Sequence, residues 1–344
     1  MQRLPRYRTG DPSLDQRIAE LVESIGALED ADLVFEMMVS AARLGRERAN
    51  RGDMKIANAA LKEMRHAFDV FAPYYATRKA AIFGSARTKP DDPLYEQTAR
   101  VAKKLADRDW MVITGAGPGI MEAGIEGAGP DNSFGAGIKL PFETATTQFL
   151  ADDPKLVMFR YFFTRKVTFI KEADGFVLLP GGFGTLDEAF ELLTLIQTGK
   201  AQPGPIVLLD VPGGTYWKTW LDFVHRELGE RHYISEHDLE LVSITDDCDE
   251  AVEEITRFFT NFHSQRYVEG DLILRMQRGP EPADLARLNR DFHDIVAKGA
   301  IERVAPSKAE LAENDVPEHA RLRFRFNRRA YARLRMLINE LNRL

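Results

Sequence analysis

The chain has 344 residues, of which 44% are hydrophobic and 29% charged, and these proportions are ordinary for a soluble globular protein. Its net charge of -7 at pH 7 argues against nucleic-acid binding as the main role. No run of 18 apolar residues occurs and the first residues lack the apolar core of a signal peptide, so we expect a cytoplasmic protein that makes no membrane contact.

Residues 1–77 are predicted to form a helical N-terminal extension. Apolar side chains recur there at helical spacing in three stretches, around residues 14–25, 33–41 and 56–71. We expect these helices to pack on the main domain or on a neighbouring subunit.

Residues 78–264 are predicted to form the main domain, in which apolar strands alternate with helices. The expected strands cover residues 80–83, 111–113, 134–140, 176–179, 206–209 and 241–244. The expected helices cover residues 93–108, 121–128, 159–172, 189–198, 216–228 and 250–262. This alternation indicates an α/β fold with a doubly wound, mainly parallel sheet covered on both faces. In such sheets ligands bind at the carboxyl ends of the strands.

Residues 265–344 are predicted to form a small basic α+β segment at the C-terminus. Its expected strands cover residues 271–275 and 321–326, and its expected helices cover 282–298 and 328–342. From the second strand to the last residue there are eight arginines and one acid. These arginines alternate with apolar residues at the spacing of a strand and then of a helix. We therefore expect most of them to lie on a solvent-exposed face or to form ion pairs with acidic residues elsewhere, rather than to bind RNA or lipid.

The stretch Pro-Gly-Gly-Phe-Gly-Thr-Leu-Asp-Glu, residues 180–188, lies between a predicted strand and a predicted helix. Its glycines let the backbone approach a ligand closely, and the start of the helix offers unpaired N–H groups and partial positive charge. The stretch is therefore a candidate phosphate cradle. Thr185 and Glu188 also have the spacing of a capping box, which would make it a plain tight turn. Both interpretations remain open from the residues alone.

The familiar nucleotide and metal motifs are not met. A dinucleotide fingerprint starting at Gly115 would need glycine where Ile120 stands, and no P-loop sequence occurs. The seven histidines are scattered, so we expect no metal site. The lone cysteine, Cys248, excludes an internal disulfide and is interpreted as structural.

A second motif, Arg165-Lys166, precedes the glycine turn. Together with Pro-Gly-Gly-Phe-Gly-Thr and Glu188 it resembles the paired signature of the LOG (Lonely Guy) family, and the resemblance covers roughly residues 78–262. That family has Rossmann-like folds and includes cytokinin riboside 5'-monophosphate phosphoribohydrolases and nucleotide 5'-monophosphate nucleosidases. The resemblance implies hydrolysis of the N-glycosidic bond of a cytokinin riboside 5'-monophosphate or AMP-like purine nucleotide, without a cofactor, by a homo-oligomer of two or more chains.

The resemblance makes Arg165 and Glu188 the catalytic pair. The residues expected on the substrate, from the motifs and from the turns after the first two predicted strands, are Glu143, Lys166, Gly181, Gly182, Phe183, Gly184, Thr185, Leu186, Asp187, Thr194, Ser85 and Gly115. Glu143 is ambiguous, since it would either accept hydrogen bonds from ribose hydroxyls or cap the next helix.

The residue types suit this chemistry. Breaking an N-glycosidic bond develops positive charge on the ribose ring. A carboxylate such as Glu188 either stabilises this charge or activates the water that attacks the ring. Arg165 offers a planar fork for the 5'-phosphate or for orienting Glu188. The alternative function is a nucleotide-binding regulatory protein that keeps the cradle without turnover.

Overall fold

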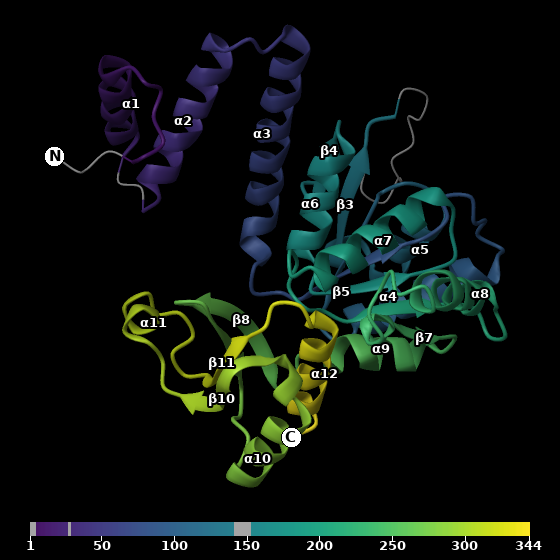
Figure 1. The fold of residues 1–344 in the computed structure, drawn as a ribbon. Helices are drawn as coiled ribbons and strands as arrows, with labels where there is room; N and C mark the ends of the chain where they lie inside the picture. Colours follow the sequence, from purple (N-terminus) through teal and green to yellow (C-terminus); the bar gives the residue numbers. More distant parts are fainter. Residues whose placement is uncertain (1–4, 27–28, 141–152) are drawn as a thin grey trace. The chain divides into compact units, whose positions relative to one another are not determined.

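The computed structural model describes residues 5–26, 29–140 and 153–344, and the chain divides into two compact units at residue 65 (Figure 1). The first unit is helical. It consists of α1 (Pro12–Ile25), α2 (Ala31–Arg46) and the greater part of α3 (Arg51–Phe71). Its small core forms where Ile18 and Val22 of α1 meet Phe35 and Val39 of α2, and all four are buried.

The long helix α3 crosses the boundary between the two units. Its last turns belong to the second unit, where Ala67 and Phe71 are fully buried. Phe71 stacks on Phe134 of the sheet with 4.3 Å between ring centroids. The compact division therefore falls at residue 65, and the domain boundary expected at residue 77 stays a prediction.

The second unit is built on a seven-stranded sheet in the order β4-β3-β2-β1-β5-β6-β7, and every neighbouring pair is parallel. Its strands are β1 (Lys79–Phe83), β2 (Met111–Thr114), β3 (Ser133–Ile138), β4 (Leu156–Phe159), β5 (Gly175–Leu178), β6 (Ile206–Leu209) and β7 (Ser243–Thr245). The strand order runs outward in both directions from the pair β1 and β5, as in a doubly wound Rossmann-like sheet. The predicted fold class is confirmed.

Helices cover both faces of this sheet. One core cluster joins it to α6 (Phe162–Glu172), α7 (Phe183–Gln197) and α8 (Tyr216–Val224). The other joins it to α4 (Pro93–Ala106), α5 (Ile120–Ala128) and α9 (Cys248–Arg257). Successive residues of a strand pack into the two clusters in turn, on opposite faces of the sheet. These strands are therefore buried on both faces and are nearly all apolar. Among the described residues, no helix is both long and apolar enough to cross a membrane.

Cys248 is the first residue of α9 and is buried. Burial raises the pKa of its thiol to about 11, so the thiol remains protonated at neutral pH. In that form it packs as a small apolar side chain.

Several predicted elements were wrong in type or extent. The strand β4 was not predicted, because its apolar run leads directly into the aromatic start of α6, and we expected one helix from residue 159. The expected helix over 282–298 is α10 (Pro282–Asp291), and the residues from Val296 onward form a strand instead.

The C-terminal residues form a four-stranded antiparallel sheet in the order β10-β11-β9-β8. The strands are β8 (Phe262–Val268), β9 (Asp271–Met276), β10 (Val296–Val304) and β11 (Ala320–Phe326). The helices of this segment are α10, α11 (Lys308–Ala312) and α12 (Tyr331–Asn342). One face of the sheet packs on α10 and α12, which leaves the arginines of β11 on the other face.

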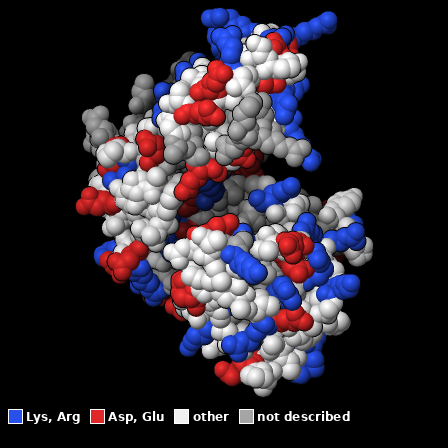
Figure 2. Space-filling view, turned by 90° about the vertical axis from the view of Figure 1, so that its left-hand side faces the viewer, with Lys and Arg blue, Asp and Glu red and all other residues white. Residues whose placement is uncertain are grey.

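Most arginines of this segment are paired. Six of the eight between residue 321 and the C-terminus make ion pairs, and Figure 2 shows basic and acidic side chains interspersed on the face in view. Arg335 is buried and donates hydrogen bonds to the carbonyls of Gly204 and Leu241, each at 2.8 Å, and to Glu254 at 2.6 Å. This arginine therefore fastens α12 to the main sheet domain.

Candidate active site

The point where the winding of the main sheet reverses lies between β1 and β5. The turn after β1 begins with Gly84 and Ser85, and the turn after β5 is the glycine stretch. The two turns are tied together, because the backbone N–H of Ser85 donates to the carbonyl of Pro180 at 3.2 Å. A crevice at this position is the usual ligand site of a doubly wound sheet.

A cavity of about 870 Å³ opens at this edge of the sheet. Eleven of the fourteen residues predicted for the site line it, namely Arg165, Glu188, the seven residues from Gly181 to Asp187, Ser85 and Gly115. Lys166 and Thr194 are outside this lining, and Glu143 lies outside the described residues. The cavity therefore gathers the turns after β1, β2 and β5.

The glycine turn leads directly into α7. Gly182 is the N-cap, Phe183 is the first helical residue, and no side chain in the described part of the chain caps the helix. Thr185 lies within the first turn, so the alternative interpretation, a capping box of Thr185 and Glu188, is wrong. The first four N–H groups of the helix, from Gly182 to Thr185, have no partner within the helix. They form an anion-binding end of the kind that holds phosphates.

The glycines of the turn have different roles. A Cβ on Gly181 would lie 2.1 Å from the Oγ1 of Thr185, so only glycine allows the turn to fold onto the helix start. A Cβ on Gly182 or Gly184 would meet no described atom within 4 Å, because that side of the backbone is open. Both line the cavity, so a ligand can approach their backbone closely.

Glu188 is buried at the cavity wall, with 9% of its surface exposed. Burial raises the pKa of its carboxyl from the ordinary 4.5 to about 7, against the opposing effect of the cations Lys166 and Arg165. A carboxyl with such a pKa exchanges protons readily near neutral pH.

Arg165 reaches the cavity from α6. Its Nε donates to the carbonyl of Ala136 at 2.7 Å, and its guanidinium lies 5.2 Å from the ring centroid of Phe169. A Cβ on Gly115 would lie 2.3 Å from a guanidinium nitrogen of Arg165. Gly115, which was predicted as a substrate contact, therefore also makes room for the arginine.

Lys166 and Thr194 are engaged with α7 itself. Lys166 forms ion pairs with Asp187 at 2.8 Å and with Glu191. The hydroxyl of Thr194 donates to the carbonyl of Phe190 at 2.7 Å, one turn earlier. Lys166 thus acts on the site through its charge, which lowers the pKa of Glu188.

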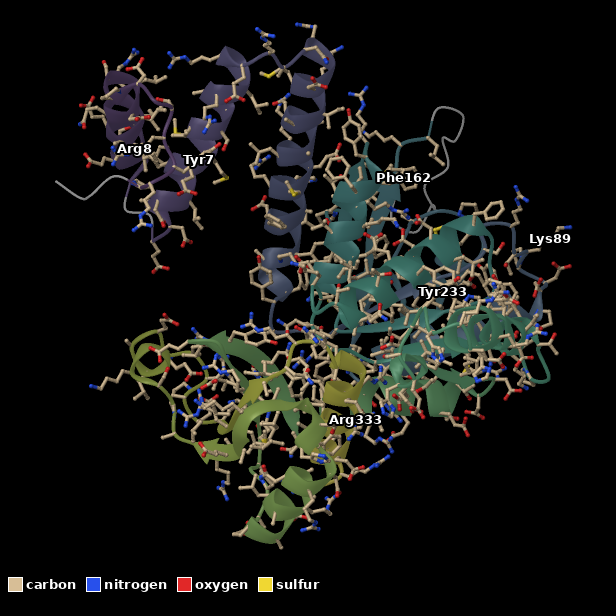
Figure 3. All side chains as sticks on the ribbon, in the orientation of Figure 1. Tyr7, Arg8, Lys89, Phe162, Tyr233 and Arg333 are labelled. Atoms are coloured by element: carbon tan, nitrogen blue, oxygen red, sulfur yellow. The ribbon has the colours of Figure 1, made fainter. Side chains whose placement is uncertain are left out.

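Sequence reasoning missed some residues of the site. Met121 lines the cavity from α5, and Tyr216 donates its hydroxyl to the carbonyl of Gly181 at 2.7 Å. Tyr216 belongs to no motif and contacts the backbone of the turn, whereas Met121 contributes to the shape of the cavity. Met158 and Phe162 also line the cavity, and Phe162 is labelled at the start of α6 in Figure 3.

Part of this chain is similar to known proteins. The family described as "Possible lysine decarboxylase" matches residues 119–255. The cytokinin riboside 5'-monophosphate phosphoribohydrolase LOG3 of Arabidopsis thaliana is 33% identical over 94 residues, which are 27% of this chain and 42% of that protein. The predicted resemblance to the LOG family is confirmed.

Two bacterial relatives extend the match. The pyrimidine/purine nucleotide 5'-monophosphate nucleosidase of Escherichia coli K12 is 28% identical over 46% of this chain and 37% of its own length. The cytokinin riboside 5'-monophosphate phosphoribohydrolase of Mycobacterium marinum is 29% identical over 51% of this chain and 90% of its own length. The chain thus spans less than half the length of LOG3 and of the E. coli nucleosidase.

Among solved structures, a molybdenum cofactor binding protein of Rippkaea orientalis aligns at 17% identity over 52% of this chain and 96% of that chain, with a TM-score of 0.39.

Proposed function

We propose that the protein is a phosphoribohydrolase, which hydrolyses the N-glycosidic bond of a nucleoside 5'-monophosphate to the free base and ribose 5-phosphate. The observation that carries the proposal is the presence of Glu188, Arg165 and the amino end of α7 in one cavity. The names of the relatives support the same reaction class. Its substrate would be a cytokinin riboside 5'-monophosphate or an AMP-like purine nucleotide.

Each part of the cavity has a task in this reaction. The N–H groups from Gly182 to Thr185, which have no partner within the helix, bind the 5'-phosphate, and the guanidinium of Arg165 adds positive charge beside it. As the bond between the ribose C1' and the base nitrogen breaks, positive charge develops on the ribose ring. The ionised carboxylate of Glu188 stabilises that charge and accepts a proton from the water that attacks C1'. The base nitrogen takes up a proton as it leaves, so the net reaction consumes one water and yields the free base.

Release of free base and ribose 5-phosphate from AMP, GMP, CMP, UMP and N6-isopentenyl-AMP tests the proposal. Water is the only co-reactant, so we expect turnover of at least one purine nucleotide without added metal or redox cofactor. Tight nucleotide binding without release of any base would contradict the proposal and favour the regulatory protein.

We also propose that the protein assembles as a homodimer or a larger homo-oligomer through the apolar surface beside the cavity. Phe163 and Val167 on α6 are about half exposed, and Phe183 at the start of α7 is 93% exposed. Large apolar side chains that are exposed to this extent are typical of association sites. Light scattering should give at least twice the chain mass of 38.9 kDa.

A charge in this apolar surface should weaken the assembly. We expect Val167→Asp to lower the measured mass, whereas Leu311→Asp, at an exposed position on α11, should leave it unchanged. A wild-type mass of one chain, or equal effects of the two substitutions, would refute this assembly.

A further inference from the structure

Three successive carbonyl groups of the glycine turn each accept a hydrogen bond from the protein. Pro180 accepts from the N–H of Ser85 at 3.2 Å, and Gly182 accepts from the N–H of Leu186 at 3.2 Å. Between them, Gly181 accepts from the hydroxyl of Tyr216 at 2.7 Å. Two of these bonds are made by the backbone of the sheet edge and of the helix, and the third is made by a side chain.

The carbonyl of Gly181 matters because of the peptide group to which it belongs. In a trans peptide the C=O of Gly181 and the N–H of Gly182 share one plane and point in opposite directions. A donor that holds this carbonyl therefore also fixes the direction of the N–H of Gly182, one of the four amides that have no partner within the helix. If the peptide flipped, a carbonyl oxygen would take the place of the N–H of Gly182 at the start of the helix, and it would repel a phosphate bound there.

This peptide is open to such a flip. It joins two glycines, whose backbone torsions are less restricted than those of other residues. A Cβ on Gly182 would have no described atom within 4 Å, so neighbouring side chains do not hold the backbone on that side. Among the described residues, Tyr216 is the side chain that hydrogen bonds to this carbonyl.

Tyr216 is itself held firmly. It is the first residue of α8, and its N–H donates to the carboxylate of Asp210 at 3.0 Å. Asp210 is buried and also accepts from the N–H of Val211 at 2.9 Å. The ring of Tyr216 packs edge-on against Trp217 with 4.9 Å between centroids. Burial raises the pKa of the phenol, so the hydroxyl keeps its proton and remains a donor.

We propose that Tyr216 is a positioning residue for the phosphate cradle, acting through the peptide between Gly181 and Gly182. This inference rests on the proposed function, because it assumes that the cradle binds the 5'-phosphate. The phosphate keeps the same contacts in the ground state and in the transition state, so the effect of Tyr216 falls on substrate binding rather than on the chemical step.

The test compares Tyr216→Phe with Tyr95→Phe. Tyr95 is a matched control, because its hydroxyl also makes a 2.7 Å hydrogen bond, to Glu126 on the opposite face of the sheet. We expect Tyr216→Phe to raise KM for the nucleotide about fivefold, as for the loss of one hydrogen bond, with kcat within about twofold of wild type. The Kd for ribose 5-phosphate, measured by calorimetry, should rise by the same factor, and Tyr95→Phe should change neither constant.

The outcomes separate this inference from the proposed function. Wild-type protein that binds ribose 5-phosphate, with an unchanged Kd in Tyr216→Phe, would overturn the role of Tyr216 alone. A fall in kcat without a change in KM would also overturn it, as would equal effects of the two substitutions. Wild-type protein that neither binds ribose 5-phosphate nor releases base would overturn the inference and the proposed function together. Circular dichroism spectra of both variants should match that of the wild type, because each substitution keeps the aromatic ring.

Discussion

Replacing Glu188 by glutamine is expected to lower kcat for nucleotide hydrolysis by about three orders of magnitude, within the range typical of a lost general acid–base group. Glutamine keeps the size of the side chain but neither carries the negative charge nor accepts the proton of the attacking water. The phosphate cradle is made of backbone groups, so binding of ribose 5-phosphate should persist. Single-turnover release of free base, measured beside calorimetric binding of ribose 5-phosphate, separates the two effects.

Asp187→Asn is the matched control for this substitution. Asp187 is the neighbouring carboxylate and also lines the cavity, but its side chain is 60% exposed and is paired with Lys166. We expect its loss to lower kcat less than tenfold. Retention of activity within tenfold by Glu188→Gln, or an equal loss in Asp187→Asn, would show that the buried carboxylate has no special part in the reaction.

The main sheet could be predicted because its strands are buried on both faces. Strands such as β1 and β6 then read as short apolar runs, and glycines or polar residues mark their ends. The strands β8 and β10 lack this signal. β8 is largely polar, and β10 buries only Ile301 and contains Gly299 with a φ of 81°. Their pairing with neighbouring strands, rather than their own side chains, determines their structure.

The helix expected over residues 282–298 shows how a correct period can mislead. Leu288, Phe292 and Ile295 are buried at spacings that fit one helical face. Only Leu288 lies in α10, however, and Ile295 belongs to a short 3-10 turn that leads into β10. All three side chains pack into the same core, so the burial pattern does not reveal where the backbone changes from helix to strand.

The part of the candidate site that consists of short sequence motifs could be predicted. Arg165 and Glu188 are 23 residues apart, but α6 leads into β5 and α7 leaves it, so both reach the same end of the sheet. The position of Tyr216 depends instead on the alignment of α8 with a carbonyl of another turn. No residue type or spacing encodes such a contact, because a backbone carbonyl is the same at every position.

The buried carboxyl of Glu188 should also make the stability of the protein depend on pH. In the unfolded chain its pKa is the ordinary 4.5, and in the folded protein burial raises that pKa to about 7. Between these values the folded state holds a proton that the unfolded state has lost, so the free energy of unfolding falls as pH rises. The difference between the two pKa values corresponds to about 3 kcal/mol, since each pKa unit is worth about 1.4 kcal/mol.

Glu188→Gln should remove this dependence, because glutamine resembles the protonated acid at every pH. We therefore expect the free energy of unfolding of the variant, relative to wild type, to increase by about 3 kcal/mol between pH 4.5 and about pH 8. Urea unfolding followed by tryptophan fluorescence measures it, because Trp110, Trp217 and Trp220 all lie in the unit that contains Glu188. Glu96→Gln, which removes a carboxylate that is 74% exposed, is the control for a change of surface charge.

If the free energies of unfolding of wild type and Glu188→Gln change in parallel with pH, this prediction is contradicted. The pKa of Glu188 would then be the same in the folded protein as in the unfolded chain. Diverging curves would show that the fold is destabilised at neutral pH by the same carboxylate that the proposed reaction uses. Such a cost is expected where an active site needs a charged group in a buried position, since desolvation disfavours the charge and only catalysis benefits from it.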